Sequence, residues 1–216
     1  EFRLSARYAF TDNFSVKAGF NSMRQYIHKL SNTVIMSPTD TWKLSDVNIK
    51  PQRGWQAAAG LYLNSPSGIW EYSVEGYYKR MSDYLDYRGG AKLLMNHHIE
   101  TDVINTQGHA YGVELQVKKQ VGKLNGWMSY TYSRTFLRQN DKRIEKPVNN
   151  GDWYPTEYDK PHDFKFVGNY KFTHRYSMSI NVDYSTGRPT TIPAGQYYDE
   201  STQSMRLYYT DCLLYT

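Results

Sequence analysis

The feature that most constrains this sequence is an alternation of apolar and polar residues with a period of two, which recurs along most of the chain. Successive side chains of an extended strand point to opposite faces, so this period predicts β-strands rather than helices. Asn125-Gly126 is a strong signal for a hairpin turn within residues 108–135, because both residues tolerate positive φ. Four residues of the first run share the apolar face: Tyr111, Val113, Leu115 and Val117.

The alternating runs predict eight strands arranged as four hairpins. Short turns are expected near Asp12, Pro66, Lys123 and His174, whereas the connections at the other end span about 20 residues or more. Long loops gathered at one end are typical of outer-membrane barrels. The strands are expected at residues 1–10, 14–26, 53–63, 69–84, within the hairpin 108–135, and at 162–172 and 176–185, with a weak further strand near Met205.

A membrane barrel is compatible with the low mean hydropathy of −0.74. No run of 18 apolar residues is present, so no transmembrane helix is expected, but a barrel strand is apolar only at every second position. In hydrocarbon every backbone amide needs a partner, so the strands must close into a ring. The aromatic share is 16%, and aromatic girdles are expected near strand ends, at Trp55, Trp70, Tyr78 and Tyr132.

The charged residues predict which face points outward. A Lys on the lipid side would cost about 2–4 kcal/mol at mid-depth, so one face is expected to line a wet lumen, with Lys17, Glu75, Glu114, Lys118, Lys165 and Asp183. The fold class predicted is therefore all-β, an antiparallel up-and-down transmembrane β-barrel segment. The residues expected to face lipid include Val113, Leu115, Val117, Phe164, Phe166, Tyr170, Ile180 and Val182.

Several segments resemble the barrel of TonB-dependent outer-membrane transporters. They are N-T-Q-G-H-A-Y-G-V-E-L at 105–115, N-G-W-M-S-Y-T-Y-S at 125–133, Y-D-K-P-H-D-F at 158–164, S-T-G-R-P-T-T-I-P at 185–193, M-R-Q-Y-I-H-K-L-S-N-T at 23–33 and N-I-K-P-Q at 48–52. The resemblance runs from about residue 1 to about residue 200. Each segment alone is only moderately specific for this family, but the order and spacing of the segments together are strongly specific.

The resemblance implies an arc of a barrel of about 22 strands, plugged by an N-terminal globular domain, in the bacterial outer membrane. It implies uptake of a scarce nutrient, such as a siderophore, a glycan or a peptide, driven through a TonB complex. The partners expected are that complex, outer-membrane lipid and a small nutrient ligand. This sequence lacks the plug and the TonB-contacting segment, and we expect it to be a fragment that begins in mid-protein.

Candidate ligand contacts lie in the long connections. The aromatic and acidic loop at 152–158 can stack on a sugar or a siderophore, or pack against neighbouring loops, and a strand end near Arg24 can meet entering ligand. The candidates are Arg24, Tyr26, His28, Trp153, Tyr154 and Tyr158. No catalytic residue, cofactor or metal is expected.

Two further groupings favour ordinary structural roles. His97-His98 with Glu100 and Asp102 has metal-binding residue types, but adjacent histidines on a strand point to opposite faces. Pro161-His162-Asp163 would suit general-base chemistry, yet its His and Asp also diverge and no nucleophile accompanies them.

The net charge of +5 is spread over strands and loops, so no nucleic-acid interface is expected. The single cysteine, Cys212, cannot form an internal disulfide. It lies in a tail that breaks the alternation, so we expect a barrel domain at 1–208 and a non-native tail at 209–216. Two alternatives remain: another outer-membrane barrel, either a porin or an enzyme, and a soluble β-sandwich binding module that buries its apolar face against a second sheet.

Overall fold

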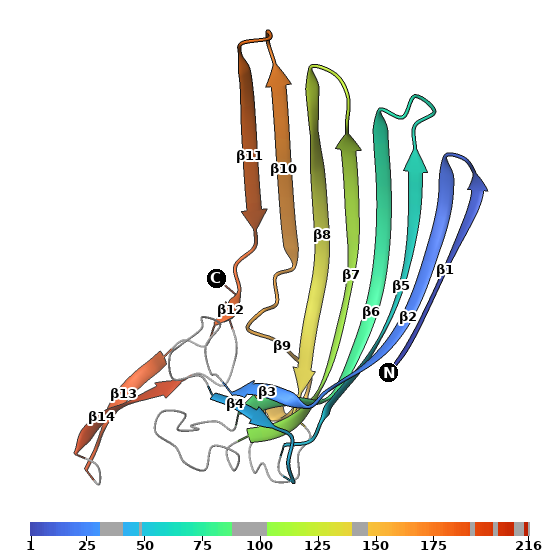
Figure 1. Ribbon diagram of the computed structural model, residues 1–216. Helices are drawn as coiled ribbons and strands as arrows, with labels where there is room; N and C mark the ends of the chain where they lie inside the picture. The colour runs from blue at the N-terminus through green and yellow to red at the C-terminus, as the bar shows by residue number, and fades with distance from the viewer. Residues whose placement is uncertain are drawn as a thin grey trace.

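The computed structural model describes residues 1–30, 41–47, 49–87, 103–139, 147–190, 193–200, 203–209 and 214–215. Its centre is one antiparallel sheet in which eight long strands are neighbours in chain order (Figure 1). These strands are β1 (Phe2–Thr11), β2 (Phe14–Gln25), β5 (Gln52–Asn64), β6 (Trp70–Tyr87), β7 (Val103–Lys119), β8 (Leu124–Arg138), β10 (His162–Lys171) and β11 (Ser177–Ser185).

The four short turns all lie at one end of the sheet, the upper end in Figure 1, and the long connections lie at the other. We call these the short-turn end and the long-connection end. The predicted up-and-down order and the shared end for the Asp12 and Lys123 turns are therefore confirmed. Side-chain hydroxyls close two of the turns: Thr11 Oγ1 accepts the N–H of Phe14 at 3.0 Å, and Thr173 Oγ1 accepts the N–H of Tyr176 at 3.1 Å.

The strand register puts the apolar residues on one face of the sheet. Residues directly opposite each other in an antiparallel pair project to the same side, so paired positions can be followed from strand to strand. One such row crosses all eight strands as Tyr8, Val16, Leu61, Val74, Leu115, Tyr130, Phe164 and Tyr184. The adjacent row, on the opposite face, is Arg7, Lys17, Gly60, Glu75, Glu114, Thr131, Asp163 and Ser185.

We call these sides the apolar face and the polar face. Within the described residues, the substantial contacts of each long strand are with its hydrogen-bonded neighbours, so no second layer covers either face. Val74 and Leu115 accordingly remain 42% and 41% exposed. A soluble sandwich would have buried these side chains.

The small hydrophobic core lies at the long-connection end. Ile49 and Val103 are fully buried, and Leu85 packs against them. Both central strands reach into this region: β6 continues to Tyr87 and β7 begins at Val103, whereas the sequence predicted a connection as far as about Gln107. The burial of Val103 against Leu85 explains why both strands are longer than predicted. At the long-connection end, each strand has an apolar side chain that packs in the core.

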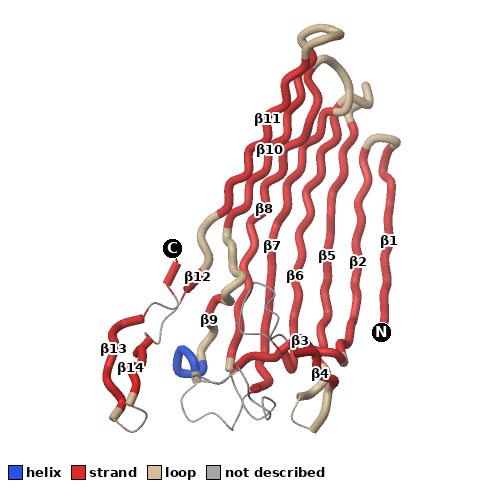
Figure 2. Tube along the Cα trace, turned by 60° about the vertical axis from the view of Figure 1, so that its left-hand side comes forward, coloured by secondary structure: helices blue, strands red, loops and turns tan. Residues whose placement is uncertain are grey.

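Parts of the connections predicted as loops are regular structure. Between β2 and β5 lies a separate hairpin of β3 (Ile27–Leu30) and β4 (Thr41–Leu44). Figure 2 shows it lying across the long-connection end of the sheet. Between β8 and β10 lie a short 3₁₀ turn at Val148–Gly151 and β9 (Tyr154–Pro155), which extends the main sheet by pairing with β8.

The weak strand predicted near Met205 exists as β14 (Ser204–Tyr209), but it pairs with β13 (Pro193–Asp199) in a separate hairpin. The short strands β12 (Pro189–Thr190) and β15 (Leu214–Tyr215) form another pair. The boundary at residue 208 and the non-native tail stay predictions. Cys212 and the His97-His98 group lie outside the described residues.

The prediction of a turn at Asn125-Gly126 is wrong. The chain turns at residues 120–123, and both residues lie inside β8, where they pair with Asn169 and Gly168 of β10. Gly126 has φ +153°, and a Cβ there would come within 2.0 Å of the Val167 carbonyl oxygen. Glycine is needed at this position for a close approach of two strands, which local turn rules do not distinguish from a hairpin.

Candidate functional site

Two bands of aromatic rings lie on the apolar face, one towards each end of the strands. Near the short turns, ring contacts join Tyr8 to Phe10, Phe10 to Phe14, Trp70 to Tyr72, and Tyr170 to Phe172. Nearer the long connections, a chain of contacts joins Phe20, Trp55, Tyr78, His109, Phe136 and Trp153. Between the two bands the row is largely aliphatic, with Val16, Leu61, Val74 and Leu115.

A buried polar network holds the β8–β10 connection against the sheet. The Tyr154 hydroxyl donates to Asp86 Oδ2 at 2.6 Å, and the Gln139 amide donates to the same oxygen at 3.1 Å. Gln139 Oε1 in turn accepts the N–H of Val148 at 2.9 Å. Burial, followed by the charge of Asp86, raises the pKa of Tyr154, so its hydroxyl keeps its proton and acts as a donor.

A second anchor is Asp159, which is 1% exposed. Its carboxylate accepts the Thr135 N–H at 2.7 Å and the Arg134 Nε–H at 3.0 Å. The guanidinium carbon of Arg134 also lies over the ring of Phe136, 4.8 Å from the ring centroid. The connection is therefore fixed at two points, Tyr154 and Asp159, to the half of β8 nearest the long-connection end.

Glu157 lies between these anchors. Its surface is still exposed, but desolvation of the carboxyl and the negative charge of Asp86 both raise its pKa, since each disfavours its ionised form. The carboxyl therefore holds its proton to a higher pH than a glutamate in water.

The candidate ligand contacts do not form one cluster. Arg24 is exposed on the apolar face, where it pairs in register with Arg53. Tyr26 is exposed, and its carbonyl accepts the Ser45 N–H at 2.8 Å. His28 is buried, with Nε2 at 3.2 Å from Ser45 Oγ, and burial lowers its pKa.

The other three candidates lie in the β8–β10 connection. Trp153 meets the ring of His109 edge-on at a centroid distance of 4.3 Å, while Tyr154 is buried and bonded to Asp86. Tyr158 is exposed. Sequence reasoning missed Asp86, Gln139 and Asp159 as organisers of this region. Asp86 and Tyr154 are 68 residues apart, and no local motif links them.

The residues predicted to face lipid share the apolar face. Val113, Leu115 and Val117 alternate along β7, and register carries the same side to β10 and β11. There it includes Phe164, Phe166, Tyr170, Ile180 and Val182.

His162 lies at the start of β10, with Nδ1 at 2.8 Å from the Tyr130 hydroxyl, and Asp163 instead lies 3.5 Å from Lys165 Nζ. The two side chains therefore have different partners. Among the described residues, no three His, Cys, Asp or Glu side chains gather as a metal site would require. None of the described helices is long and apolar enough to cross a membrane.

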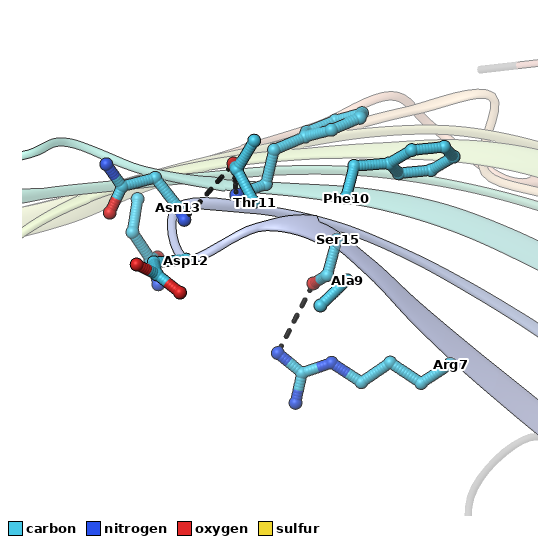
Figure 3. Close-up of a pocket in the computed structure, with 9 residues that line it drawn as sticks. Arg7, Ala9, Phe10, Thr11, Asp12, Asn13 and Ser15 are labelled. Carbon is cyan, nitrogen blue, oxygen red and sulfur yellow. Dashed lines mark hydrogen bonds between the residues drawn. The ribbon is translucent and has the colours of Figure 1, made fainter.

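A shallow cavity lies at the short-turn end, beside the β1–β2 turn (Figure 3). Figure 3 shows the Phe10 ring on the side of the strands away from Arg7, whose guanidinium donates to Ser15 Oγ at 3.3 Å. The hollow lies beside β1, an edge strand of the described sheet. Its lining also includes the polar residues Thr11, Asp12, Asn13 and Asn64.

Three solved structures resemble this chain, each over 96% of its length. A complex of FpvAI with pyocin S2 has a TM-score of 0.60 at 10% identity. Pseudomonas aeruginosa FpvA bound to a heterologous pyoverdine has 0.59 at 12%, and the ferripyoverdine receptor of the outer membrane of Pseudomonas aeruginosa has 0.58 at 11%. At these identities the likeness concerns the fold, and the chain spans about a quarter of the length of those proteins.

No curated protein matches the sequence. A family model described as "TonB dependent receptor-like, beta-barrel" matches residues 2–211, nearly the whole chain. The chain therefore belongs to the β-barrel family of TonB-dependent receptors.

Proposed function

We propose that this chain forms part of the wall of an outer-membrane transporter, which takes up a scarce nutrient by energised passage through a plugged barrel. The TonB complex would supply the energy through a segment outside this sequence. Membership of the receptor family supports this proposal. The observation that carries it is the pair of opposite rows across all eight strands: one is apolar, and the other has charged residues on five of the eight strands.

The apolar face is proposed to contact lipid, through Val113, Leu115 and Val117 of β7 and their counterparts on β10 and β11. The distance between the two aromatic bands is close to the height of the apolar band of an outer-membrane barrel. Trp70 and Tyr78 are eight positions apart on β6, which is about 26 Å along a strand and about 20 Å across a membrane at a tilt of about 40°. Aromatic girdles flank an apolar band of about 25 Å in barrels of this kind.

The polar face is proposed to line the wet interior. On β6 the polar-face residues from Glu71 to Lys79 are half-buried, whereas the apolar-face residues are exposed apart from Gly76. Side chains crowd together on the concave side of a curved sheet and spread apart on the convex side. This difference favours a concave polar face, as a barrel interior requires.

The long connections are proposed to face outwards from the cell and meet the ligand. Tyr26 and Tyr158 keep exposed rings at this end, which suits stacking on a siderophore or a glycan. Trp153 instead packs against His109 in the aromatic band of the apolar face. His28 and Tyr154 are proposed to act by holding these connections in place, since both are buried and hydrogen-bonded internally. Iron–siderophore complexes, glycans and peptides all remain compatible ligands.

Two alternatives are less well supported. A soluble binding module would cover its apolar row with a second layer, and the described residues provide none. A passive porin or an outer-membrane enzyme shares the barrel, but the family match favours a receptor.

The experiment compares Leu115→Arg with Gln116→Arg in the complete receptor. These neighbours on β7 belong to opposite faces. A lipid-facing arginine near mid-depth costs about 2–4 kcal/mol, whereas one in the lumen costs little. We expect Leu115→Arg to lower the amount of folded receptor in the outer membrane and its resistance to urea, with Gln116→Arg close to wild type. Equal effects, or the reverse order, would contradict the assignment of the faces.

The transport step is tested separately. Cells that carry the complete receptor should accumulate its nutrient only while TonB is present, as measured with labelled iron–siderophore complexes and glycans. Uptake that continues without TonB would favour a porin.

A further inference from the structure

Three arginines lie side by side on the apolar face, just beyond the aromatic band near the long connections. Arg24 of β2 is directly opposite Arg53 of β5, and Arg80 of β6 pairs with Trp55, two residues further along β5. All three side chains are exposed. Three adjacent strands therefore contribute one cation each to a compact basic cluster, which we call the arginine trio.

The trio carries more positive charge than the acidic side chains of the described residues balance. Like charges directly opposite each other in a sheet are destabilising, and Arg24 opposite Arg53 is such a pair. Among the described residues, the ion pair with this trio comes from Asp83, whose Oδ2 lies 3.0 Å from the Arg53 guanidinium. Two positive charges remain in excess. A bound anion would offset the repulsion between them.

Other arginines of this region are occupied within the protein. Arg134 pairs with the buried Asp159, and Arg138 donates to the Gly151 carbonyl at 2.8 Å. Within the trio, Arg53 pairs with Asp83, whereas Arg24 and Arg80 make no hydrogen bond or ion pair within the described part of the chain. The row continues through Ser82 and Gln107, whose side chains add further polar groups.

The position of the trio identifies the kind of anion. Arg80 is ten positions from Trp70 on β6, which is about 33 Å along the strand and about 25 Å across a membrane at a tilt of about 40°. This equals the height of the apolar band of an outer-membrane barrel. The guanidinium groups therefore lie at the boundary between hydrocarbon and water, where lipid headgroups carry their phosphates. A ligand inside the barrel is on the opposite side of the wall.

We propose that Arg24, Arg53 and Arg80 form a binding site for a phosphorylated lipid headgroup of the outer leaflet. This inference rests on the proposed membrane orientation. The arginine fork suits a phosphate because two N–H groups can bind two of its oxygens at once. The rings of Trp55 and Tyr78, whose centroids are 5.5 Å apart, lie beside the trio. They can pack against the first segment of the acyl chains.

The experiment uses the complete receptor purified in a mild detergent and titrated with lipid A, a phosphorylated glycolipid, with bound lipid counted by native mass spectrometry. The test variant is the triple substitution Arg24→Gln, Arg53→Gln and Arg80→Gln. The control, Arg3→Gln with Lys17→Gln and Lys79→Gln, removes the same charge from the polar face. Dephosphorylated lipid A and inorganic phosphate are titrated in parallel.

We expect the test variant to bind lipid A at least about tenfold more weakly than wild type, while the control stays within about twofold. Dephosphorylated lipid A should bind wild type as weakly as lipid A binds the test variant, and inorganic phosphate should not displace lipid A at equal concentration. The proposal is overturned if the test variant retains wild-type affinity, if the control loses as much, or if the phosphate groups make no difference. The Leu115 and Gln116 comparison tests the orientation independently.

Discussion

At the scale of single residues, Gly126 makes the sharpest stability prediction. A Cβ at this position would lie 2.0 Å from the Val167 carbonyl oxygen, and the backbone has a φ that side chains rarely adopt. Gly126→Ala should therefore force β8 away from β10 and lower the free energy of unfolding of the receptor by at least about 2 kcal/mol. Urea unfolding in lipid vesicles, followed by tryptophan fluorescence, measures the loss.

Gly19→Ala in β2 is the matched control. Its Cβ would meet the Leu4 carbonyl oxygen at 3.8 Å, an ordinary contact. The substitution should change stability by no more than about 0.5 kcal/mol. If both variants were equally stable, the close approach of β8 and β10 would be wrong.

Glu157 predicts how the β8–β10 connection responds to pH. Its pKa is raised in the folded connection, so the folded form binds a proton more tightly than the unfolded form. The contribution of this group to stability is therefore greatest at acidic pH. It decreases as the pH rises from the ordinary glutamate range through the raised pKa.

Hydrogen exchange of residues 147–161 should accordingly speed up as the pH rises through that window, after correction for the intrinsic rate. Glu157→Gln should remove most of this dependence, whereas Asp152→Asn, an exposed neighbour on the same connection, should preserve it. An unchanged pH profile in Glu157→Gln would assign the dependence to another group.

At the scale of elements, a β-bulge at Asp83 decides which face the end of β6 presents. Ser82 pairs with Gln107, but Tyr84 pairs with Thr106, so Asp83 is the extra residue, with φ +56°. Asp83→Val should disfavour the bulge, because a β-branched residue rarely adopts positive φ. If the strand straightens with residue 83 paired, residues 84–87 change faces and Asp86 moves away from Tyr154. The β8–β10 connection should then be cleaved faster in limited proteolysis, while the apolar face stays in the membrane.

Asp83→Gly is the control for this substitution. Glycine adopts positive φ without strain, so the bulge should persist. Protease resistance close to wild type is expected, although the ion pair with Arg53 is lost. An Asp83→Val variant with a fully protected connection would show that the bulge does not set the position of Asp86.

The long strands could be predicted from the sequence because their information is local. Alternation alone gives the face of Leu115 or Phe166, whatever the strand pairs with. The bulge at Asp83 and the close approach at Gly126 could not be predicted in this way, since each depends on what the neighbouring strand brings opposite. The same holds for the Asp86–Tyr154 bond, whose partners lie on β6 and β9, 68 residues apart in the sequence.

The candidate site was less predictable than the fold. Tyr154 and His28 are aromatic or titratable residues in loops, which favours a ligand contact on sequence alone, but both are buried in internal hydrogen bonds. The arginine trio has no sequence motif at all. Its members lie on three strands, and only the register of those strands brings them together.

At the scale of the whole molecule, stability has two sources at different depths. Across the middle of the sheet, hydrogen-bonded strands carry exposed aliphatic residues, so the described protein provides little packing there. At the long-connection end, Ile49, Val103 and Leu85 form a small core beside the Asp86 and Asp159 networks. A lipid bilayer would supply the missing apolar surroundings, and the core would hold the connections in water.

This division predicts the behaviour of the 216-residue chain expressed alone. Strands β1 and β11 are unpaired edges of the described sheet, and the apolar face between them is uncovered. Both features favour association between copies in water. In buffer without detergent, light scattering should find large assemblies. Detergent or lipid vesicles should be needed to keep the chain dispersed, because only an apolar solvent can satisfy this face. A β-sandwich would instead run as a monomer on size exclusion in plain buffer, and that result would exclude the membrane assignment.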